Sequence, residues 1–216
     1  MLSVIKKEKI KSKKNKNIKN LRKKVGVVFQ FPEYQLFEES VEKDVAFGPK
    51  NFGVPEEEAL KIAHKYLKIV GIKESYFKRS PFELSGGERR KVAIAGILAL
   101  ENDVLILDEP TSGLDRPSSK EIMGIVEKLH KSGKTIILIT HDMYLVMKDA
   151  SRVVILNNGL ITYNGNPTEA FNKHLIEAPE IVEFIFKLNS KGFNIPLENI
   201  HSIQDLYPYL LRKTHE

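Results

Sequence analysis

Two adjacent carboxylates, Asp108 and Glu109, directly follow an apolar run at residues 104–107 that is typical of a buried strand. Successive side chains of a strand point to opposite sides, so the two acids can serve different tasks. One can hold Mg²⁺, usually through water, while the other orients and polarises an attacking water. A strand that ends in solvated acids is the ordinary alternative. Taken alone, the pair leaves both interpretations open.

A second group, Ser85-Gly86-Gly87-Glu88, stands at the start of a pattern typical of an almost wholly buried helix. Two glycines let the backbone approach a ligand closely, and the exposed amides favour an anion, with about 0.3 to 1 kcal/mol from the helix dipole at surface sites. An ordinary helix cap by Ser85 is the simpler alternative. This group alone therefore does not identify a phosphate site.

The elements that must position these residues alternate between strand and helix. Gln30 closes a short apolar run, and Thr140-His141-Asp142 follows another. The pattern predicts strands at residues 25–29, 104–107 and 135–139, and helices at 39–47, 55–70, 88–99 and 117–129. Such an order predicts an α/β fold with a parallel sheet, helices on both faces, and ligand sites beyond the carboxyl ends of the strands.

The remaining third of the chain has a different pattern. Residues 152–156 and 160–163 flank Asn157-Asn158-Gly159 and predict a hairpin. Short helical segments are expected at residues 167–172, 179–188 and 203–211. We therefore predict an appended helical segment from residue 167 onward.

Composition limits the class of protein. The chain has 216 residues, 42% of them hydrophobic and 29% charged, and it has no cysteine. No apolar run approaches the roughly 18 to 20 residues that cross a bilayer, and the lysine-rich start lacks a signal-peptide pattern. We expect a soluble globular protein without disulfides or thiolate metal sites, consistent with the cytoplasm.

Positive charge is concentrated at the N-terminus. Residues 1–24 hold eleven Lys and Arg against one acid, Glu8, whereas the whole chain has a net charge of +6. Such a segment suits a nucleic-acid arm or a membrane-surface patch, and a solvated, disordered lead-in at residues 1–23 is the interpretation we favour. No aromatic residue lies among the lysines to stack on bases. We therefore expect no nucleic-acid partner.

The order of the motifs resembles that of the ABC-type ATPases, from about residue 24 to residue 165. The matching segments are Gln30, residues 84–88, residues 107–115 and Thr140-His141-Asp142. The resemblance implies an incomplete P-loop NTPase-like ABC ATPase domain at residues 24–166, with a parallel sheet flanked by helices and a helical signature subdomain. Residues 167–216 are then a C-terminal helical segment.

The resemblance also implies an ATPase that uses ATP and Mg²⁺, and it assigns roles to single residues. Asp108 matches the Walker B metal ligand and Glu109 the general base. Gln30 matches the glutamine near Mg²⁺ and the attacking water, and His141 the switch histidine at the γ-phosphate. Other roles lie across a dimer. Asp115 contacts the partner subunit, and Ser85 to Glu88, called the signature, contact the γ-phosphate of ATP bound to the opposite subunit.

A narrower resemblance covers residues 30–37 and 41–49. These segments are similar to the ATPase subunits of energy-coupling factor importers and of related cobalt importers, in which this region docks the membrane subunit. Residues 192–195 resemble the extra C-terminal segment of these subunits. The resemblance implies a peripheral protein on the cytoplasmic face of the cell membrane. The implied partners are an identical or paralogous ATPase, a transmembrane coupling subunit and a substrate-specific membrane subunit.

One part of the family pattern is not found in these 216 residues. The phosphate loop G-x-x-x-x-G-K-[ST] has only a near-match, Ser132-Gly133-Lys134-Thr135, in which Lys128 occupies the first glycine position. We interpret the near-match as a decoy. The expectation is that this chain's own ATP site is defective, that its sheet leaves apolar surface bare, and that its signature completes the site of a partner.

Two alternatives to an importer subunit remain. One is an inactive remnant that keeps the surface of the family without its activity. The other is a soluble ABC ATPase of nucleic-acid metabolism, although the 55 positions from Gln30 to Ser85 leave no room for the long coiled coil of such proteins.

Overall fold

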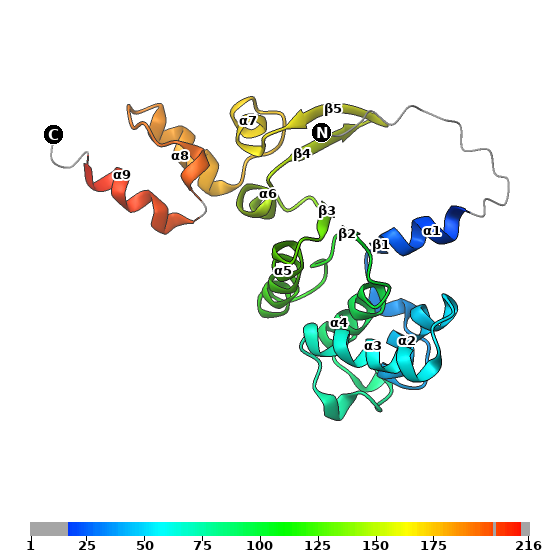
Figure 1. Cartoon of the computed structure of the whole chain (residues 1–216). Helices are drawn as coiled ribbons and strands as arrows, with labels where there is room; N and C mark the ends of the chain where they lie inside the picture. Colours follow the sequence, from blue (N-terminus) through cyan, green and yellow to red (C-terminus); the bar gives the residue numbers. More distant parts are fainter. Residues whose placement is uncertain (1–16, 201, 213–216) are drawn as a thin grey trace. The chain divides into compact units, whose positions relative to one another are not determined.

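The computed structural model describes residues 17–200 and 202–212. The chain forms two compact units, one ending at Ile139 and the other beginning at Thr140 (Figure 1). The predicted end of the ABC ATPase domain at residue 166 stays a prediction. Packing explains why the compact units divide earlier, because Val153 of the hairpin and Met143 pack on Phe171 and share a core with the helices that follow.

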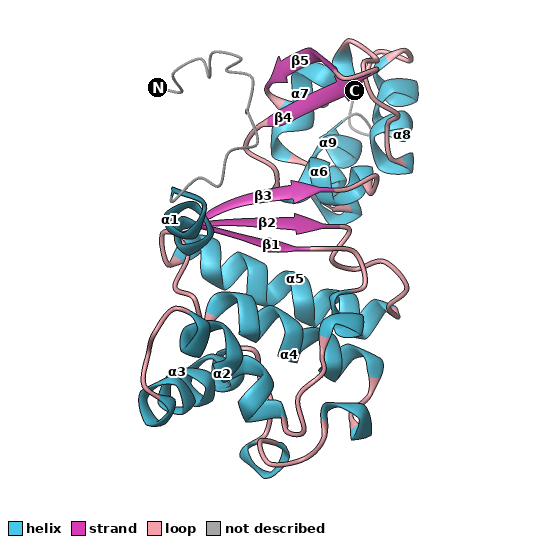
Figure 2. Cartoon of the chain, turned by 90° about the vertical axis from the view of Figure 1, so that its right-hand side faces the viewer, coloured by secondary structure: helices cyan, strands magenta, loops and turns pink. Residues whose placement is uncertain are grey.

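Three parallel strands form the sheet of the first unit. Strand β1 (Val25–Val28) pairs with β2 (Val104–Asp108), which pairs with β3 (Thr135–Ile139), as Figure 2 shows. The register aligns Val28, Leu107 and Leu138 across the sheet. Parallel strands must be joined by crossovers, and the helical segments predicted between the strands supply them. The predicted parallel α/β arrangement is confirmed.

Within this unit the helices cover one face of the sheet. Val28, Leu105 and Leu107 are buried there against α4 (Gly86–Leu98) and α5 (Arg116–Lys131). On the other face, Ile137 and Ile139 are 46% and 51% exposed. Among residues 17–139 no helix covers this face, and the expectation of helices on both faces of the sheet stays a prediction.

Two further helices, α2 (Val41–Asn51) and α3 (Glu56–Ile69), pack beside α4 and complete the core of the first unit. Pro55 is the N-cap of α3, so the helix begins one position after the predicted start at residue 55, and three glutamates fill the first turn, where the helix dipole favours them. Short 3₁₀ helices connect these elements at Pro32–Gln35, Glu74–Tyr76 and Pro81–Glu83.

Helix α1 (Asn17–Lys24) corrects the expectation of a disordered lead-in over its last residues. The buried Asn102 side chain donates hydrogen bonds to the carbonyls of Arg22 (3.2 Å) and Lys23 (3.0 Å) at the end of this helix. Gly26 makes the close approach possible, since a Cβ there would lie 2.5 Å from Asn102 Oδ1. Residues 1–16 of the predicted lead-in lie outside the described residues.

The second unit combines a hairpin with short helices. Asn158 and Gly159 both have positive φ, as a two-residue hairpin turn requires. Helix α6, which the sequence did not predict, shares one small core with α7 and α8, and a separate core surrounds Ile185 and Ile200. The elements are α6 (Met143–Asp149), β4 (Val153–Asn157), β5 (Leu160–Gly165), α7 (Pro167–Asn172), α8 (Glu180–Asn189), α9 (Tyr207–Arg212) and 3₁₀ helices at Leu197–Asn199 and Ile203–Leu206. In neither part of the described chain, 17–200 or 202–212, does any helix have the length and apolar character of a membrane span.

Candidate functional site

Gln30, Asp108 and Glu109 come to the same edge of the sheet. Asp108 is the last residue of β2, and Gln30 follows the end of β1 by two residues. The pairing of Val28 with Leu107 places both at the carboxyl ends of adjacent strands. The Gln30 side chain also donates a hydrogen bond from Nε2 to Ser112 Oγ, at 3.3 Å. The predicted meeting of these segments is therefore present in the structure.

Glu109 has a left-handed backbone conformation, with φ of 45°. For a residue other than glycine this conformation costs about 1 to 3 kcal/mol and persists only where surrounding contacts enforce it. The Glu109 N–H donates to the Ile139 carbonyl at 2.9 Å, and the Glu109 carbonyl accepts from the Ser112 N–H at 3.1 Å. Strand alternation therefore does not extend to Glu109, because the chain turns sharply directly after Asp108.

Ser85 is the N-cap of α4 and forms a complete capping box with Glu88. The Ser85 hydroxyl donates to Glu88 Oε2 at 2.7 Å, and the Ser85 N–H donates to the same oxygen at 3.0 Å. The hydrogen bond from the Ser85 hydroxyl is the main reason why the pKa of Glu88 lies below its usual value. Both Ser85 and Gly86 are exposed. The capping role is thus real, and it leaves the start of the helix accessible to an anion.

Asp115 lies near the signature because the start of α5, which it caps, contacts the start of α4. Asp115 is the N-cap of α5 and accepts a hydrogen bond from the Ser118 N–H at 2.8 Å. Gly87 lies against the same Ser118, whose Oγ is 3.2 Å from where a Gly87 Cβ would stand. Hydrogen bonds from Ser118 lower the pKa of Asp115. Two predicted cross-dimer segments therefore lie side by side within one unit.

His141 lies in the second unit, directly before α6. Its neighbour Asp142 caps α6 by accepting hydrogen bonds from the N–H groups of Tyr144 (2.9 Å) and Leu145 (3.3 Å). The Asp142 N–H donates to Thr140 Oγ1 at 3.0 Å. These contacts hold the chain on both sides of His141. All other predicted site residues belong to the first unit.

The sequence prediction missed Arg90. This side chain is 1% exposed, and it hydrogen-bonds to Glu33 and to the carbonyls of Pro110 and Ser112, beside both Gln30 and Glu109. An arginine within the apolar stripe of a helix predicted to be almost wholly buried was the available signal, because a buried charge needs partners.

The near-match to a phosphate loop lies at the opposite edge of the sheet from Asp108. Ser132 is the C-cap of α5, Gly133 has φ of 96°, and Thr135 is the first residue of β3. The segment is a tight turn that leads into the amino end of a strand. It therefore cannot contribute to a site at the carboxyl ends.

The residues present are compatible with Mg²⁺ that is bound in the way nucleotide-binding sites bind it, with few protein ligands. Across the described residues, no group of three or more His, Asp or Glu side chains forms a protein-built metal cage. Mg²⁺ in such sites takes one or two carboxylates together with phosphate oxygens and waters. Asp108 and Gln30 match this limited set of protein ligands, and Mg²⁺ would neutralise the charge that develops on the phosphates.

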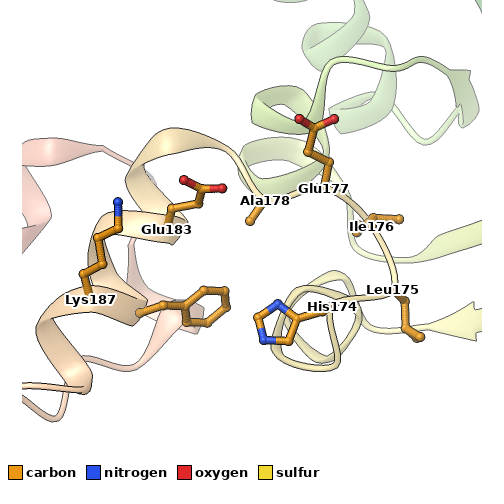
Figure 3. Close-up of a pocket in the computed structure, with 8 residues that line it drawn as sticks. His174, Leu175, Ile176, Glu177, Ala178, Glu183 and Lys187 are labelled. Atoms are coloured by element: carbon orange, nitrogen blue, oxygen red, sulfur yellow. The ribbon is translucent and has the colours of Figure 1, made fainter.

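The second unit contains a hollow of about 590 Å³, shown in Figure 3. His174 and Phe186 face each other edge to face, with ring centres 5.3 Å apart. Glu177, Glu183 and Lys187 also line it. None of the residues predicted for the nucleotide site lies there.

Comparisons with known proteins define the class. Residues 3–112 match the ABC transporter family. The solved structure of cbiO1 from Clostridium perfringens, part of the ABC transporter complex cbiONQ, is similar with a TM-score of 0.66 and 40% identity, covering 82% of this chain and 67% of that one. A dimeric ATP-binding cassette bound to ADP and Pi is similar with a TM-score of 0.58 and 30% identity, covering 69% and 65%. The fold is that of an ABC ATPase domain.

Curated relatives narrow the class. The energy-coupling factor transporter ATP-binding protein EcfA2 of Enterococcus faecalis is 50% identical over 212 residues, which are 94% of this chain and 72% of that protein. EcfA2 of Mycoplasmopsis synoviae is 50% identical over 192 residues, which are 86% of this chain and 62% of that protein. This chain belongs to the family of energy-coupling factor transporter ATP-binding proteins. It spans about two thirds of the length of these relatives.

Proposed function

We propose that this chain is the ATP-binding subunit of an energy-coupling factor importer, where ATP hydrolysis drives uptake of a vitamin or a transition-metal ion, and that its own ATP site is defective while its signature completes the site of the partner ATPase. The observation that carries the proposal is the hydrogen-bonded edge at which Gln30, Asp108 and Glu109 meet, in a chain 50% identical to EcfA2 over 212 residues. That edge combines metal ligands with a carboxylate base. These groups are part of the set that phosphoryl transfer to water requires, and the phosphate loop with its lysine, which completes that set, is not found in these 216 residues.

Each side chain has a distinct role in this proposal. Asp108 and Gln30 hold Mg²⁺, and Glu109 accepts the proton of the attacking water. The exposed start of α4, with Ser85 to Glu88, contacts the γ-phosphate of ATP bound to the opposite subunit. Asp115 contacts that subunit beside the signature, and His141 contacts the γ-phosphate.

In this proposal the signature, Ser85 to Glu88, acts on a second ATPase with which the chain forms a pair. The second ATPase is an identical or paralogous subunit, and the capped, exposed Ser85 supplies the signature for its nucleotide. The exposed aromatic side chains of Tyr34, Phe37 and Phe47 support docking of a transmembrane coupling subunit at residues 30–49. A substrate-specific membrane subunit completes the assembly, with this chain peripheral on the cytoplasmic face.

Co-expression tests the assembly. A tagged copy of the chain is purified with a second ATPase of the same family and the two membrane subunits, and the recovered complex is assayed for ATP hydrolysis. Recovery of all subunits with ATPase activity supports the proposal. A matched surface variant, Lys61→Gln in the exposed Glu57–Lys61 pair of α3, keeps both properties. Failure of the chain to co-purify with either the ATPase or the membrane subunits would contradict it.

A further inference from the structure

Arg90 is a fully buried charge on α4, two residues after the signature. Its side chain is 1% exposed, whereas its ion-pair partner Glu33 is 10% exposed. A guanidinium group in such surroundings is costly to bury unless hydrogen bonds and an opposite charge compensate for the lost water. The partners that compensate for the burial of Arg90 are therefore the parts of the structure that it holds together.

The partners of Arg90 come from two separate segments. Nε and Nη2 donate to the two carboxylate oxygens of Glu33 at 3.0 and 2.8 Å, which makes a bidentate pair. Nη1 donates to the carbonyls of Pro110 at 3.1 Å and Ser112 at 2.7 Å. The guanidinium also lies 5.6 Å from the ring centre of Phe31. One planar group thus joins residues 31–33 to residues 110–112.

Both segments carry residues of the candidate site. Glu33 follows Gln30 by three positions, and Pro110 follows Glu109 directly. The hydrogen bond from Gln30 to Ser112 crosses between the same two segments. Since α4 begins at the signature, Arg90 joins these two segments to the helix that carries the signature.

The charge of Glu33 supports this arrangement. Burial raises the pKa of the Glu33 carboxyl, but the hydrogen bonds from Arg90 oppose burial, and the net effect lowers the pKa below its usual value. Glu33 is therefore ionised at neutral pH, as a bidentate ion pair requires.

We propose that Arg90 is a positioning residue that holds the Gln30 segment and the loop after Glu109 in one fixed arrangement relative to the signature helix. The catalytic consequence rests on the proposed function, since it concerns the same nucleotide site. A lysine would keep the charge but could not form the planar fork to Glu33 while also bonding two carbonyls. Arg90→Lys is therefore the informative variant.

Hydrogen exchange on the full chain tests the positioning directly. In Arg90→Lys, the amides of Gln30, Phe31 and Glu33 and of residues 111–113 exchange at least about tenfold faster, while those of α3 are unchanged. Glu33→Gln loosens residues 30–33 alone, because Arg90 keeps both carbonyl partners. The control Val70→Ala, which shortens a buried side chain after α3, increases exchange around α3 instead. Unchanged exchange at both segments, or an increase spread through the whole unit, overturns the proposal.

Kinetics of the assembled complex test the catalytic consequence. Arg90→Lys lowers kcat about tenfold and leaves the KM for ATP within about twofold, because positioning acts on the reacting groups more than on binding. The double variant Arg90→Lys/Glu33→Gln is no slower than Arg90→Lys alone, since both changes break one link. Additive losses overturn the proposal. An inactive wild-type complex contradicts the proposed function instead, and the exchange experiment still decides the role of Arg90.

Discussion

Gln30 Nε2 donates a hydrogen bond to Ser112 Oγ at 3.3 Å, although 82 positions separate the two residues in the chain. The contact joins the end of β1 to the loop that follows the Asp108-Glu109 pair. It fixes a neutral amide to the loop that follows the two carboxylates, at the carboxyl edge of a parallel sheet, where ligand sites of this fold class form. ATP hydrolysis should therefore be sensitive to substitutions at the carboxyl edge of the sheet, in this chain's own site, and at the start of α4, in the partner's site.

Glu109→Gln separates this chain's own site from the site that its signature completes on the partner. The amide keeps the size of the side chain but cannot accept the proton of the attacking water, so any turnover at this chain's own site should fall about 10²- to 10⁴-fold, whereas turnover at the partner's site should stay within about twofold of wild type. The rate is measured at saturating Mg-ATP, with Glu127→Gln on the exposed side of α5 as the control. A rate of the complex within about twofold of wild type agrees with a defective site on this chain, and a fall of about tenfold or more would contradict it.

Two substitutions at Ser85 separate its capping role from its ligand role. Ser85→Ala removes the cap of α4 and should lower the free energy of unfolding by about 1 kcal/mol. Ser85→Asp keeps an oxygen that can cap α4 but sets a second carboxylate against Glu88, which the Ser85 hydroxyl contacts at 2.7 Å. Stability should therefore also fall by about 1 kcal/mol, while the added negative charge repels a phosphate at the helix start. Urea unfolding and the ATPase rate of the complex are measured for both variants.

A cap in the second unit provides the matched control for Ser85. The Asn166 side chain caps α7 by accepting a hydrogen bond from the Thr168 N–H at 2.8 Å. Asn166→Ala should lose a similar amount of stability without changing hydrolysis. If Ser85→Asp hydrolyses ATP as fast as wild type, Ser85 is a cap and nothing more.

Stability should depend on pH through Glu33. Because the pKa of Glu33 is lowered in the folded state, its contribution is present above its unfolded pKa, near 4.5, and is lost as pH falls through the lower folded pKa. At pH 7, Glu33→Gln should destabilise the chain by about 1 to 3 kcal/mol, because a buried charged donor loses its partner. Unfolding measured from pH 7 to pH 3 should show this difference shrinking below about pH 4.5. A difference that stays constant over that range would contradict the ion pair.

Local pattern was enough to predict most elements of the fold. The strand Thr135–Ile139 has the predicted ends, and α7 does as well. Helix α6 was missed because only Val146 of its seven residues is buried, which leaves almost no periodic signal. The end of the basic segment forms α1 because Asn102, about eighty positions away, holds its last carbonyls, a contact that local sequence does not specify.

The candidate site was predictable in its residues but not in its internal links. Gln30, Asp108 and Glu109 follow strand ends, and strand ends can be read from apolar runs. The Arg90–Glu33 pair spans 57 positions, so neither periodicity nor spacing could reveal it. The left-handed backbone of Glu109 likewise depends on the Ile139 carbonyl of the neighbouring strand. Long-range contacts of this kind appear only once the sheet is assembled.

The most direct measurement of the proposed function is ATP turnover by the purified complex of this chain with a partner ATPase and the membrane subunits. Turnover should require the chain, should fall at least about tenfold with Ser85→Asp, and should return when Ser85 is restored. The same turnover from the partner and membrane subunits without this chain, or with Ser85→Asp in place of the wild type, would contradict a role for its signature in ATP hydrolysis.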